Sequence, residues 1–439
     1  MEKLLKFITE HADDEVSRLI LARNKYPEID IDLAVNCIES RRKLKGKVLE
    51  WYEEPALIFP LKLSAEQCSS SATGAYKAAL AEKIADIPAW TIADLTGGLG
   101  VDSWFFSQRA KRVIYNEMQP ALCDAARHNF KVLGANNIEI VNRMVSPGNC
   151  IDPEHTPDII YLDPARRGEG GKKVFLIEDC TPDVLTLKDE LFSIARHILI
   201  KLSPMADITM VCERLGSTCR EVHVVATGGE CKELLIWMDR EWNGEYTIIA
   251  VELRPDSLPA TFSFLPSEEK QCSLNHLCND VILKALRQHG GVDMPPPARG
   301  CLSIAKTGVN ETICLNAAYL FEPGKALMKA GAFNLISKRL EISKLGISTH
   351  YYITDSADQA ENLKQFGKVF QILECHPLDK RSIKEIGRKY PKAEVTARNI
   401  PMDTDSLRKK LGITSGDDAH IFGLKSDAEG NLLIAARRI

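Results

Sequence analysis

The chain has 439 residues, 45% of them hydrophobic and 26% charged, which is typical of a globular protein with two to four domains. Its formal net charge of −4 argues against a strongly basic nucleic-acid binder. The charge is uneven, because residues 301–439 hold 21 lysines and arginines against 16 acids, a balance of +5 that leaves −9 on the remainder. With no apolar run of about 18 residues and no signal peptide, a cytoplasmic protein without a membrane partner is expected.

The first 62 residues have apolar positions at helical spacing, in "EVSRLILARNKYP" and "IDLAVNCIESRRKLKGK". They predict an N-terminal helical domain over residues 1–62. The next segment, "SAEQCSSSATGAYKAALAEKIADIP", predicts a polar loop that enters an alanine-rich helix. Its hydroxyl groups either cap that helix or close over a cofactor.

From Trp90 onward the pattern changes to short apolar strands that alternate with helices. "WTIADLT", "RVIYNEM", "IEIVNRM", "PDIIYLDP" and "HILIKLSP" predict parallel strands joined by crossovers. "REVHVVATGG" and "CKELLIWMDR" follow with only a short glycine turn between them, which predicts an antiparallel hairpin. This order predicts an α/β domain over residues 63–240, a doubly wound seven-stranded sheet with a terminal antiparallel hairpin. It resembles the S-adenosylmethionine-dependent methyltransferase version of the doubly wound fold more than the ordinary dinucleotide-binding one.

The glycine loop "ADLTGGLGVDS" lies at the end of the first of these strands. Its glycines do not fit the G-x-G-x-x-G dinucleotide pattern, and no Lys-Ser/Thr pair follows them as in a P-loop. Asp94 and Asp102 disfavour a phosphate ligand. S-adenosylmethionine (SAM) has no phosphate but carries a sulfonium and an ammonium group, so an acidic residue beside the loop suits SAM.

The second strand ends in Glu117, where an acidic side chain can accept both ribose hydroxyls of an adenosine. The pair of Asp94 and Glu117 favours SAM over NAD, and the structural alternative is a glycine turn with two solvated carboxylates. Asn142 ends the third strand, either beside the adenine or on the surface. The predicted cofactor-binding residues are Asp94, Thr96, Gly97, Gly98, Gly100, Asp102, Glu117 and Asn142.

The fourth strand carries the motif "PDIIYLDPARR", in which Asp163 stands at the carboxyl end of the strand and faces the ligand crevice. The motif resembles the (Asp/Asn/Ser)-Pro-Pro-(aromatic) signature of methyltransferases that modify exocyclic amines of nucleobases. That resemblance implies that Asp163 accepts a hydrogen bond from the amine, while Pro164 fixes the turn. Ala165 and Arg166 depart from the signature, although a guanidinium can also stack on a base. The predicted catalytic residues are Asp163, Pro164 and Arg166; in the structural alternative Asp163 caps the next segment.

Further basic residues near this crevice are candidates for substrate binding. Arg166 and Arg167 follow the motif, and Lys172 lies in the glycine-rich loop "GEGGKKVF", which is either a lid or a surface loop. Lys201, in "IKLSPMAD", is expected at the rim of the same crevice. No metal is expected, because "CSLNHLC" offers no fourth ligand nearby.

Taken together, "DLTGGLGVDS", "NEMQP" and "YLDPARRG" resemble a little-characterised group of bacterial class I SAM-dependent methyltransferases with a THUMP-like C-terminal domain. "EQCSSSATGAYKA" and "FEPGKALMKAGAFN" are similar to the same group. The resemblance implies a C-terminal α+β region, with a small ferredoxin-like domain over residues 241–330 and a THUMP-like domain over residues 331–439. It also implies a SAM-dependent enzyme.

THUMP domains are associated with RNA, so the resemblance implies an RNA substrate, tRNA or rRNA. The basic stretch from Lys380 to Lys410 suits this partner, with Arg388, Lys389 and Arg398 as candidate phosphate contacts. A solvated helix face is the alternative for that stretch. Methylation of a protein or a small molecule, and a non-catalytic RNA-binding protein that retains the SAM fold, are the alternative functions.

Overall fold

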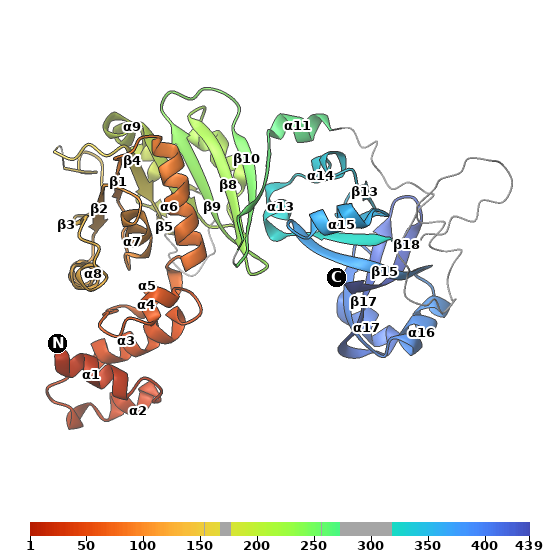
Figure 1. The fold of residues 1–439 in the computed structure, drawn as a ribbon, viewed down its shortest axis with the longest axis horizontal. Helices are drawn as coiled ribbons and strands as arrows, with labels where there is room; N and C mark the ends of the chain where they lie inside the picture. The colour runs from red at the N-terminus through yellow and green to blue at the C-terminus, as the bar shows by residue number, and fades with distance from the viewer. Residues whose placement is uncertain (153, 167–176, 256, 273–317) are drawn as a thin grey trace. The chain divides into compact units, whose positions relative to one another are not determined.

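The computed structural model describes residues 1–152, 154–166, 177–255, 257–272 and 318–439, which form two compact units (Figure 1). The first unit consists of Met1–Ile249 and Leu253–Ser257, and the second of Ala250–Glu252 and Leu258–Ile439. The N-terminal helices therefore belong to the same unit as the predicted sheet. Within these ranges, no helix is both long enough and apolar enough to cross a membrane.

Short helices form the beginning of the first unit. They are α1 (Glu2–Glu10), α2 (Val16–Leu21), a 3-10 turn (Arg23–Lys25), α3 (Ile31–Leu44), α4 (Leu49–Tyr52) and α5 (Lys62–Gln67). The segment between α4 and α5 is fixed to the sheet domain by Asn129, whose side chain donates to Ile58 O at 2.8 Å and accepts from Ile58 N at 2.9 Å. A side-chain amide that satisfies both main-chain groups of one buried residue holds the extended segment in place.

Helix α6 (Ser71–Ala85) leads into the sheet. Ser70 and Thr73 form a capping box, in which each side chain bonds the main-chain nitrogen of the other residue. The serine-rich segment before α6 thus has the helix-capping role that the sequence indicated. Tyr76, one turn further along, donates to or accepts from His223 Nδ1 at 2.7 Å.

The sheet of the first unit has the order β3-β2-β1-β4-β7-β9-β8. β1, β2, β3, β4 and β7 pair in parallel, whereas β9 is antiparallel to both β7 and β8. Gly228 and Gly229, with φ of +60° and +80°, form the tight turn of the β8–β9 hairpin. The doubly wound seven-stranded sheet with its terminal hairpin is confirmed.

The elements of this unit alternate along the chain as the sequence predicts. The strands are β1 (Thr91–Asp94), β2 (Arg112–Glu117), β3 (Ile138–Asn142), β4 (Ile159–Leu162), β7 (His197–Leu202), β8 (Cys219–Thr227), β9 (Glu230–Asp239) and β10 (Thr247–Leu253). The helices are α7 (Val101–Ser107), α8 (Pro120–Val132), α9 (Val184–Ile194) and α10 (Ile208–Leu215). A short ribbon of β5 (Ala165–Arg166) and β6 (Cys180–Thr181) follows β4, with a 3-10 turn at Ile177–Asp179.

The second unit contains a seven-stranded sheet with the order β13-β14-β12-β15-β18-β17-β16. Its strand pairs are antiparallel except for the parallel pair β16–β17. The strands of this sheet are β12 (Tyr319–Pro323), β13 (Ser343–Lys344), β14 (Tyr352–Thr354), β15 (Gly367–Pro377), β16 (Lys392–Arg398), β17 (Thr414–Ser426) and β18 (Gly430–Arg438). The unit also contains β11 (Ala260–Phe264), which is not part of this sheet. The helices are α11 (Pro266–Gln271), α13 (Lys325–Ala330), α14 (Leu335–Arg339), α15 (Ala357–Leu363), α16 (Lys380–Lys389) and α17 (Thr404–Leu411).

Helices α16 and α17 pack together over one apolar core of this sheet, to which Ile386, Leu407 and Leu411 contribute. Gly387 allows the close approach, since a Cβ atom there would lie 1.9 Å from the main-chain oxygen of Leu411. The exposed side chains of α16 include Arg381, Lys384 and Arg388. Their spacing places them along one face of the helix, opposite the core.

Candidate active site

The glycine loop between β1 and α7 has a shape that larger residues would prevent. A Cβ atom at Gly97 would lie 2.2 Å from the ring of Tyr115, and one at Gly100 would lie 2.7 Å from Phe130. Gly98 and Gly100 also have φ of +54° and +92°, in the left-handed region. The hydroxyl of Tyr115 donates to Gly98 O at 2.6 Å. The rings of Tyr115 and Phe130 therefore pack against the loop and fix its position. The main chain of the loop forms part of the surface of the site.

Glu117, at the end of β2, holds the same loop from the side. Its carboxylate accepts from Gly98 N at 2.9 Å and from Gln119 N at 2.8 Å. Only 7% of the residue is exposed. A carboxylate has about four lone-pair positions, so both oxygens can still accept from a ligand. The geometry agrees with a carboxylate that accepts from a ribose diol.

Asp94, at the end of β1, is buried, and both oxygens of its carboxylate already accept hydrogen bonds within the protein. Its carboxylate accepts from the Ser103 hydroxyl at 2.6 Å and from Thr96 N at 3.1 Å. Burial raises the pKa of Asp94 to about 7, and these two hydrogen bonds only partly oppose the rise. Asp94 lines the cavity beside the glycine loop, but its hydrogen bonds chiefly connect the loop to the first turn of α7.

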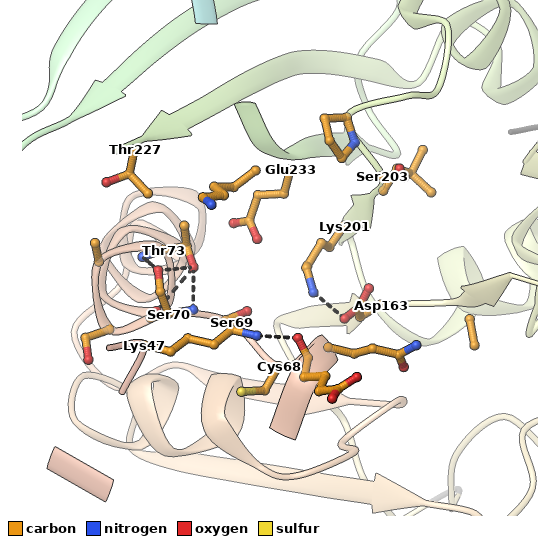
Figure 2. Close-up of a pocket in the computed structure, with 18 of the residues that line it drawn as sticks. Lys47, Cys68, Ser69, Ser70, Thr73, Asp163, Lys201, Ser203, Thr227 and Glu233 are labelled. Carbon is orange, nitrogen blue, oxygen red and sulfur yellow. Dashed lines mark hydrogen bonds and ion pairs between the residues drawn. The ribbon is translucent and has the colours of Figure 1, made fainter. Parts of the chain in front are cut away.

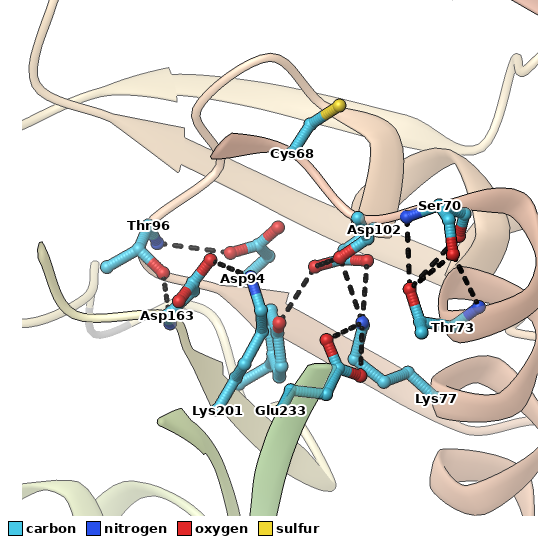
Figure 3. Close-up of polar contacts among 12 residues, drawn as sticks. Cys68, Ser70, Thr73, Lys77, Asp94, Thr96, Asp102, Asp163, Lys201 and Glu233 are labelled. Carbon is cyan, nitrogen blue, oxygen red and sulfur yellow. Dashed lines mark hydrogen bonds and ion pairs between the residues drawn. The ribbon is translucent and has the colours of Figure 1, made fainter. Parts of the chain in front are cut away.

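Asp102 belongs to a buried polar network that the sequence did not reveal (Figure 3). Its carboxylate accepts from Ser69 at 3.0 Å and from Tyr161 at 2.8 Å, and it lies 3.3 Å from the ammonium of Lys77. Lys77, with no exposed surface, also donates to both oxygens of Glu233, at 2.8 and 3.0 Å. Burial alone would raise the pKa of Asp102, but the charges of Lys77 and Lys201, together with the hydrogen bonds from Tyr161 and Ser69, outweigh burial and the net shift is downward.

Asp163 lies at the end of β4, two residues beyond the Tyr161 that pairs with Asp94 across the parallel strands. Its main-chain nitrogen donates to Thr96 Oγ1 at 2.6 Å. Its carboxylate, 38% exposed, forms an ion pair with Lys201 from β7, the neighbouring strand (Figure 2). Thr96 and Lys201 together determine where the Asp163 carboxylate lies.

Two cavities meet at this point. The smaller, of about 240 Å³, is lined by the glycine loop and by Glu117, Asp94 and Asp163. The larger, of about 1230 Å³, is drawn in Figure 2 and is also lined by Asp163. Both cavities are lined by Gln67, Cys68, Ser69, Asp163 and Ala165. The arrangement suits two ligands that meet beside Asp163, one in each cavity.

The smaller cavity fits SAM on the evidence of its own residues. A Cβ atom at Gly98 would meet only Thr96 O, at 3.8 Å, so the space in front of the loop is open. Glu117 offers the paired acceptor that a ribose requires, and Asp163 stands where this cavity meets the larger one. When bound, SAM supplies a methyl group on a positively charged sulfur. The three carboxylates predicted from the strand ends are thus brought together.

Not all of the predicted residues line the smaller cavity. Pro164 and Lys201 line only the larger cavity, and Asn142 lines neither, because its amide donates to Glu117 O at 2.7 Å. Arg143, Met144 and Val145 occupy the cavity wall next to it. Arg166 pairs through its main chain with Cys180 in the β5–β6 ribbon. Arg167 and Lys172 lie outside the described residues, and Arg388, Lys389 and Arg398 belong to the second unit.

Closure over a cofactor was one of the two alternatives for the segment that contains Gln67, Cys68 and Ser69, but a cavity wall from the preceding N-terminal helices was not predicted. Gln67 and Cys68 at the end of α5 line both cavities, and Lys47 lines the larger one. The ion pair of Lys77 and Glu233 was also not predicted. The only sequence signal for Lys77 is a lone cation in the middle of an alanine-rich helix, and its acidic partner is 156 residues away.

Comparisons with known proteins agree with this geometry. Residues 319–360 match a ferredoxin-like domain family, and residues 367–438 match the THUMP domain-like family. An uncharacterised S-adenosylmethionine-dependent methyltransferase from Mycobacterium tuberculosis H37Rv is 21% identical over 322 residues, which is 73% of each chain, and the protein of strain CDC 1551 matches equally. A protein from Porphyromonas gingivalis W83, whose crystal structure is described as that of a methyltransferase, is 27% identical to this chain. The two structures superpose with a TM-score of 0.76, and the match covers 99% of this chain and 97% of the other.

Proposed function

We propose that this chain, a SAM-dependent methyltransferase with a THUMP-like domain at its C-terminal end, transfers the methyl group to a nucleobase of RNA. The THUMP-like domain carries the proposal, because domains of this kind are associated with RNA. Within it, α16 has five basic residues and one acid among its ten positions. Arg381, Lys384 and Arg388 are exposed along one face, where they can contact phosphates without reading sequence.

In this proposal, the smaller cavity holds the cofactor and the larger one the acceptor. Glu117 accepts from the ribose hydroxyls, and the main chain around Gly98 lies against the amino acid part. Asp163 orients the acceptor atom toward the methyl group, because it borders both cavities. Fixing the two reactants in line accounts for most of the rate gain in such a transfer. Thr96 and Lys201 act through Asp163, as positioning groups.

The test is incubation of the full chain with SAM labelled in its methyl group and with separate tRNA, rRNA and protein fractions. The RNA should come from cells that lack this protein, so that the target sites are unmodified. Label in RNA that digestion assigns to one nucleoside is the expected result. Label confined to the protein fraction, or no label in any fraction while S-adenosylhomocysteine (SAH) still binds, would overturn the proposal.

Two variants make the test specific to the site. Asp163→Asn is expected to reduce RNA methylation at least 100-fold while the affinity for SAH stays within about tenfold, since Asp163 is one lining residue among many. Asp158→Asn is the matched control: Asp158 accepts from Thr91 N at the opposite end of β1 and lines neither cavity. Full activity of Asp163→Asn would remove that residue from the reaction.

A further inference from the structure

One wall of the larger cavity comes from the N-terminal helices. Arg42, in the last turn of α3, and Lys47, three residues after that helix, both line this cavity, and neither lines the smaller one. The main chain of Lys47 is fixed to the start of α6, because Ser71 N donates to Lys47 O at 2.8 Å. Figure 2 shows the Lys47 side chain among those that line the cavity. The N-terminal helices thus place two cations in its wall.

Both cations have main-chain oxygens as their hydrogen-bond acceptors. Arg42 donates through Nε and Nη2 to Ala12 O and through Nη2 to Asp14 O. Lys47 donates to Glu66 O at 2.6 Å and to Ala65 O at 3.4 Å. Among the residues that the structure describes, neither cation forms an ion pair with a carboxylate. Since an ammonium has three donors and a guanidinium five, each can still donate to a ligand.

The acidic residues of the larger cavity are not available to these two cations. Each already has a lysine partner: Asp163 pairs with Lys201, Glu233 with Lys77, and Glu66 with Lys43. The basic residues that line the cavity are Arg42, Lys43, Lys47, Lys201 and Lys232, against three acids. The larger cavity therefore carries an excess of positive charge, and a negatively charged ligand suits it.

Lys47 shows what this excess costs. Burial is the main reason that the pKa of its ammonium is lowered, and the charges of Lys201 and Lys232 lower it further, although Cys68 partly opposes them. A bound anion would offset both effects, because it would replace the lost hydration of the ammonium and compensate the repulsion between the cations. The contact geometry and the charge balance therefore favour the same kind of ligand at Lys47.

We propose that Arg42 and Lys47 bind a phosphate group of the RNA backbone, so that the N-terminal helices form part of the RNA-binding surface. A phosphodiester carries one negative charge and two free oxygens, which can accept from Arg42 Nη1 and from the Lys47 ammonium. Because these cations line the same cavity as Asp163, the phosphate belongs to the target nucleotide or to its neighbour. The inference rests on the proposed function and adds a second contact to that of α16.

The test measures the binding of a fluorescein-labelled pool of single-stranded ribonucleotide pentamers of random sequence. Fluorescence anisotropy gives the affinity over a range of salt concentrations, in the presence of SAH. Every protein is the full chain and carries Lys384→Ala/Arg388→Ala, so that α16 contributes less to binding. A pool is used because phosphate contacts do not depend on base sequence.

Arg42→Gln/Lys47→Gln removes both charges, while each glutamine keeps a donor for the main-chain oxygens. We expect affinity at low salt to fall about five- to tenfold and the slope of log K against log salt to fall by about 0.7, the contribution of one phosphate of a single strand. Affinity for SAH should stay within about threefold, because neither residue lines the smaller cavity. An unchanged slope, or no binding of the pool by the protein that retains Arg42 and Lys47, would overturn the inference.

Two further variants and a matched control separate charge from folding. Lys47→Gln alone keeps Arg42 and its contacts to the loop after α1, and it should still lower the slope, whereas Lys47→Arg should not. Lys83→Gln/Arg109→Gln is the control, because both residues pair with acids outside the two cavities and belong to the same unit. A loss for Lys47→Arg equal to that for Lys47→Gln, or an equal loss in the control, would overturn the inference.

A competitor identifies the class of anion. Hexaglutamate is the probe for an acidic peptide, and we expect it to displace the labelled pool only at much higher concentrations than unlabelled pentamers do. Displacement at equal or lower concentrations would mean that the wall binds acidic protein segments, and this would overturn a phosphate contact.

Failure of this inference is distinct from failure of the proposed function. Methyl label in RNA together with an unchanged salt slope would leave an RNA methyltransferase but overturn the contact at Arg42 and Lys47. Label confined to protein would overturn both. Label in RNA, a lowered slope and a loss of kcat/KM that arises mainly from a higher KM would support both, because a backbone contact contributes equally to the ground state and the transition state.

Discussion

The main-chain nitrogen of Asp163 donates a 2.6 Å hydrogen bond to the hydroxyl of Thr96, so the end of β4 is tied to the glycine loop that follows β1. Thr96 N in turn donates to Asp94. One threonine thus connects the two segments that we assign to acceptor and cofactor. A shift in the loop is transmitted to Asp163 directly.

Replacing this hydroxyl tests the connection. Thr96→Val leaves the Asp163 N–H without its acceptor, a loss of about 1–3 kcal/mol for an unsatisfied group. We expect kcat to fall at least tenfold, with SAH affinity unchanged within about threefold. Thr96→Ser restores the hydroxyl and should recover most of the rate. Equal rates for Thr96→Val and the wild type, measured with labelled SAM and RNA, would show that the hydrogen bond does not position Asp163.

Glu117→Gln addresses the cofactor side. The glutamine keeps one carbonyl oxygen for Gly98 N or Gln119 N but loses the charge that strengthens hydrogen bonds to a diol. Charge-assisted bonds contribute about 1.5–3 kcal/mol each, so calorimetry should show SAH binding weakened by about 10- to 100-fold. Glu139→Gln is the control, because Glu139 pairs with Arg112 and lines neither cavity. Unchanged SAH affinity in Glu117→Gln would exclude a ribose contact.

The buried ion pair of Lys77 and Glu233 predicts a large stability effect. Lys77→Met leaves Glu233 and Asp102 buried without their cation, which typically costs about 3–5 kcal/mol. The double variant Lys77→Met/Glu233→Gln removes one of the stranded charges and should be more stable than the single variant. Urea unfolding measures both. Lys83→Met, which removes a lysine whose side chain is 60% exposed, should change stability by less than about 1 kcal/mol; a loss as large as that of Lys77→Met would contradict the argument.

The positions of the motifs were predictable, but their partners were not. Asp94, Glu117 and Asp163 each stand at the end of an apolar strand, and parallel strands bring their carboxyl ends to one edge of the sheet. The sequence alone therefore predicted that these three carboxylates lie close together. Lys201 was expected at the rim of the same crevice, because it lies near the end of another strand of the sheet, but its ion pair with Asp163 was not predicted. Local patterns carry no information about such pairs, because the partner is chosen by the packing of the whole unit.

The domain organisation was likewise predictable only in part. Short strands and a glycine turn predicted the order of the sheet and its hairpin. The contribution of the N-terminal helices to both cavities was not predictable, because it depends on long-range contacts such as the two hydrogen bonds between Asn129 and Ile58.

The exposed face of α16 predicts a salt-dependent affinity for RNA. Lys384→Ala/Arg388→Ala removes two cations from that face, so the slope of log K against log salt should fall by about 2, with similar loss for different RNA sequences. Lys83→Ala/Arg109→Ala removes two cations from the first unit and is the control. Filter binding with tRNA over a range of salt concentrations measures both slopes, and identical slopes would exclude α16 from the interface.

Asp94 predicts a pH dependence of stability. Its pKa is about 7 in the folded state against 3.8 for the free group, so between these values the folded protein holds a proton that the unfolded chain has released. Stability must therefore fall as pH rises through this window, by at most about 1.4 kcal/mol per pH unit. Asp94→Asn has no proton to lose and can still bond Thr96 N and Ser103. Urea unfolding gives the free energy of unfolding of both proteins. The value for Asp94→Asn minus that for the wild type should rise by about 2–3 kcal/mol between pH 5 and pH 7.5. A constant difference over this range would mean that Asp94 is charged throughout.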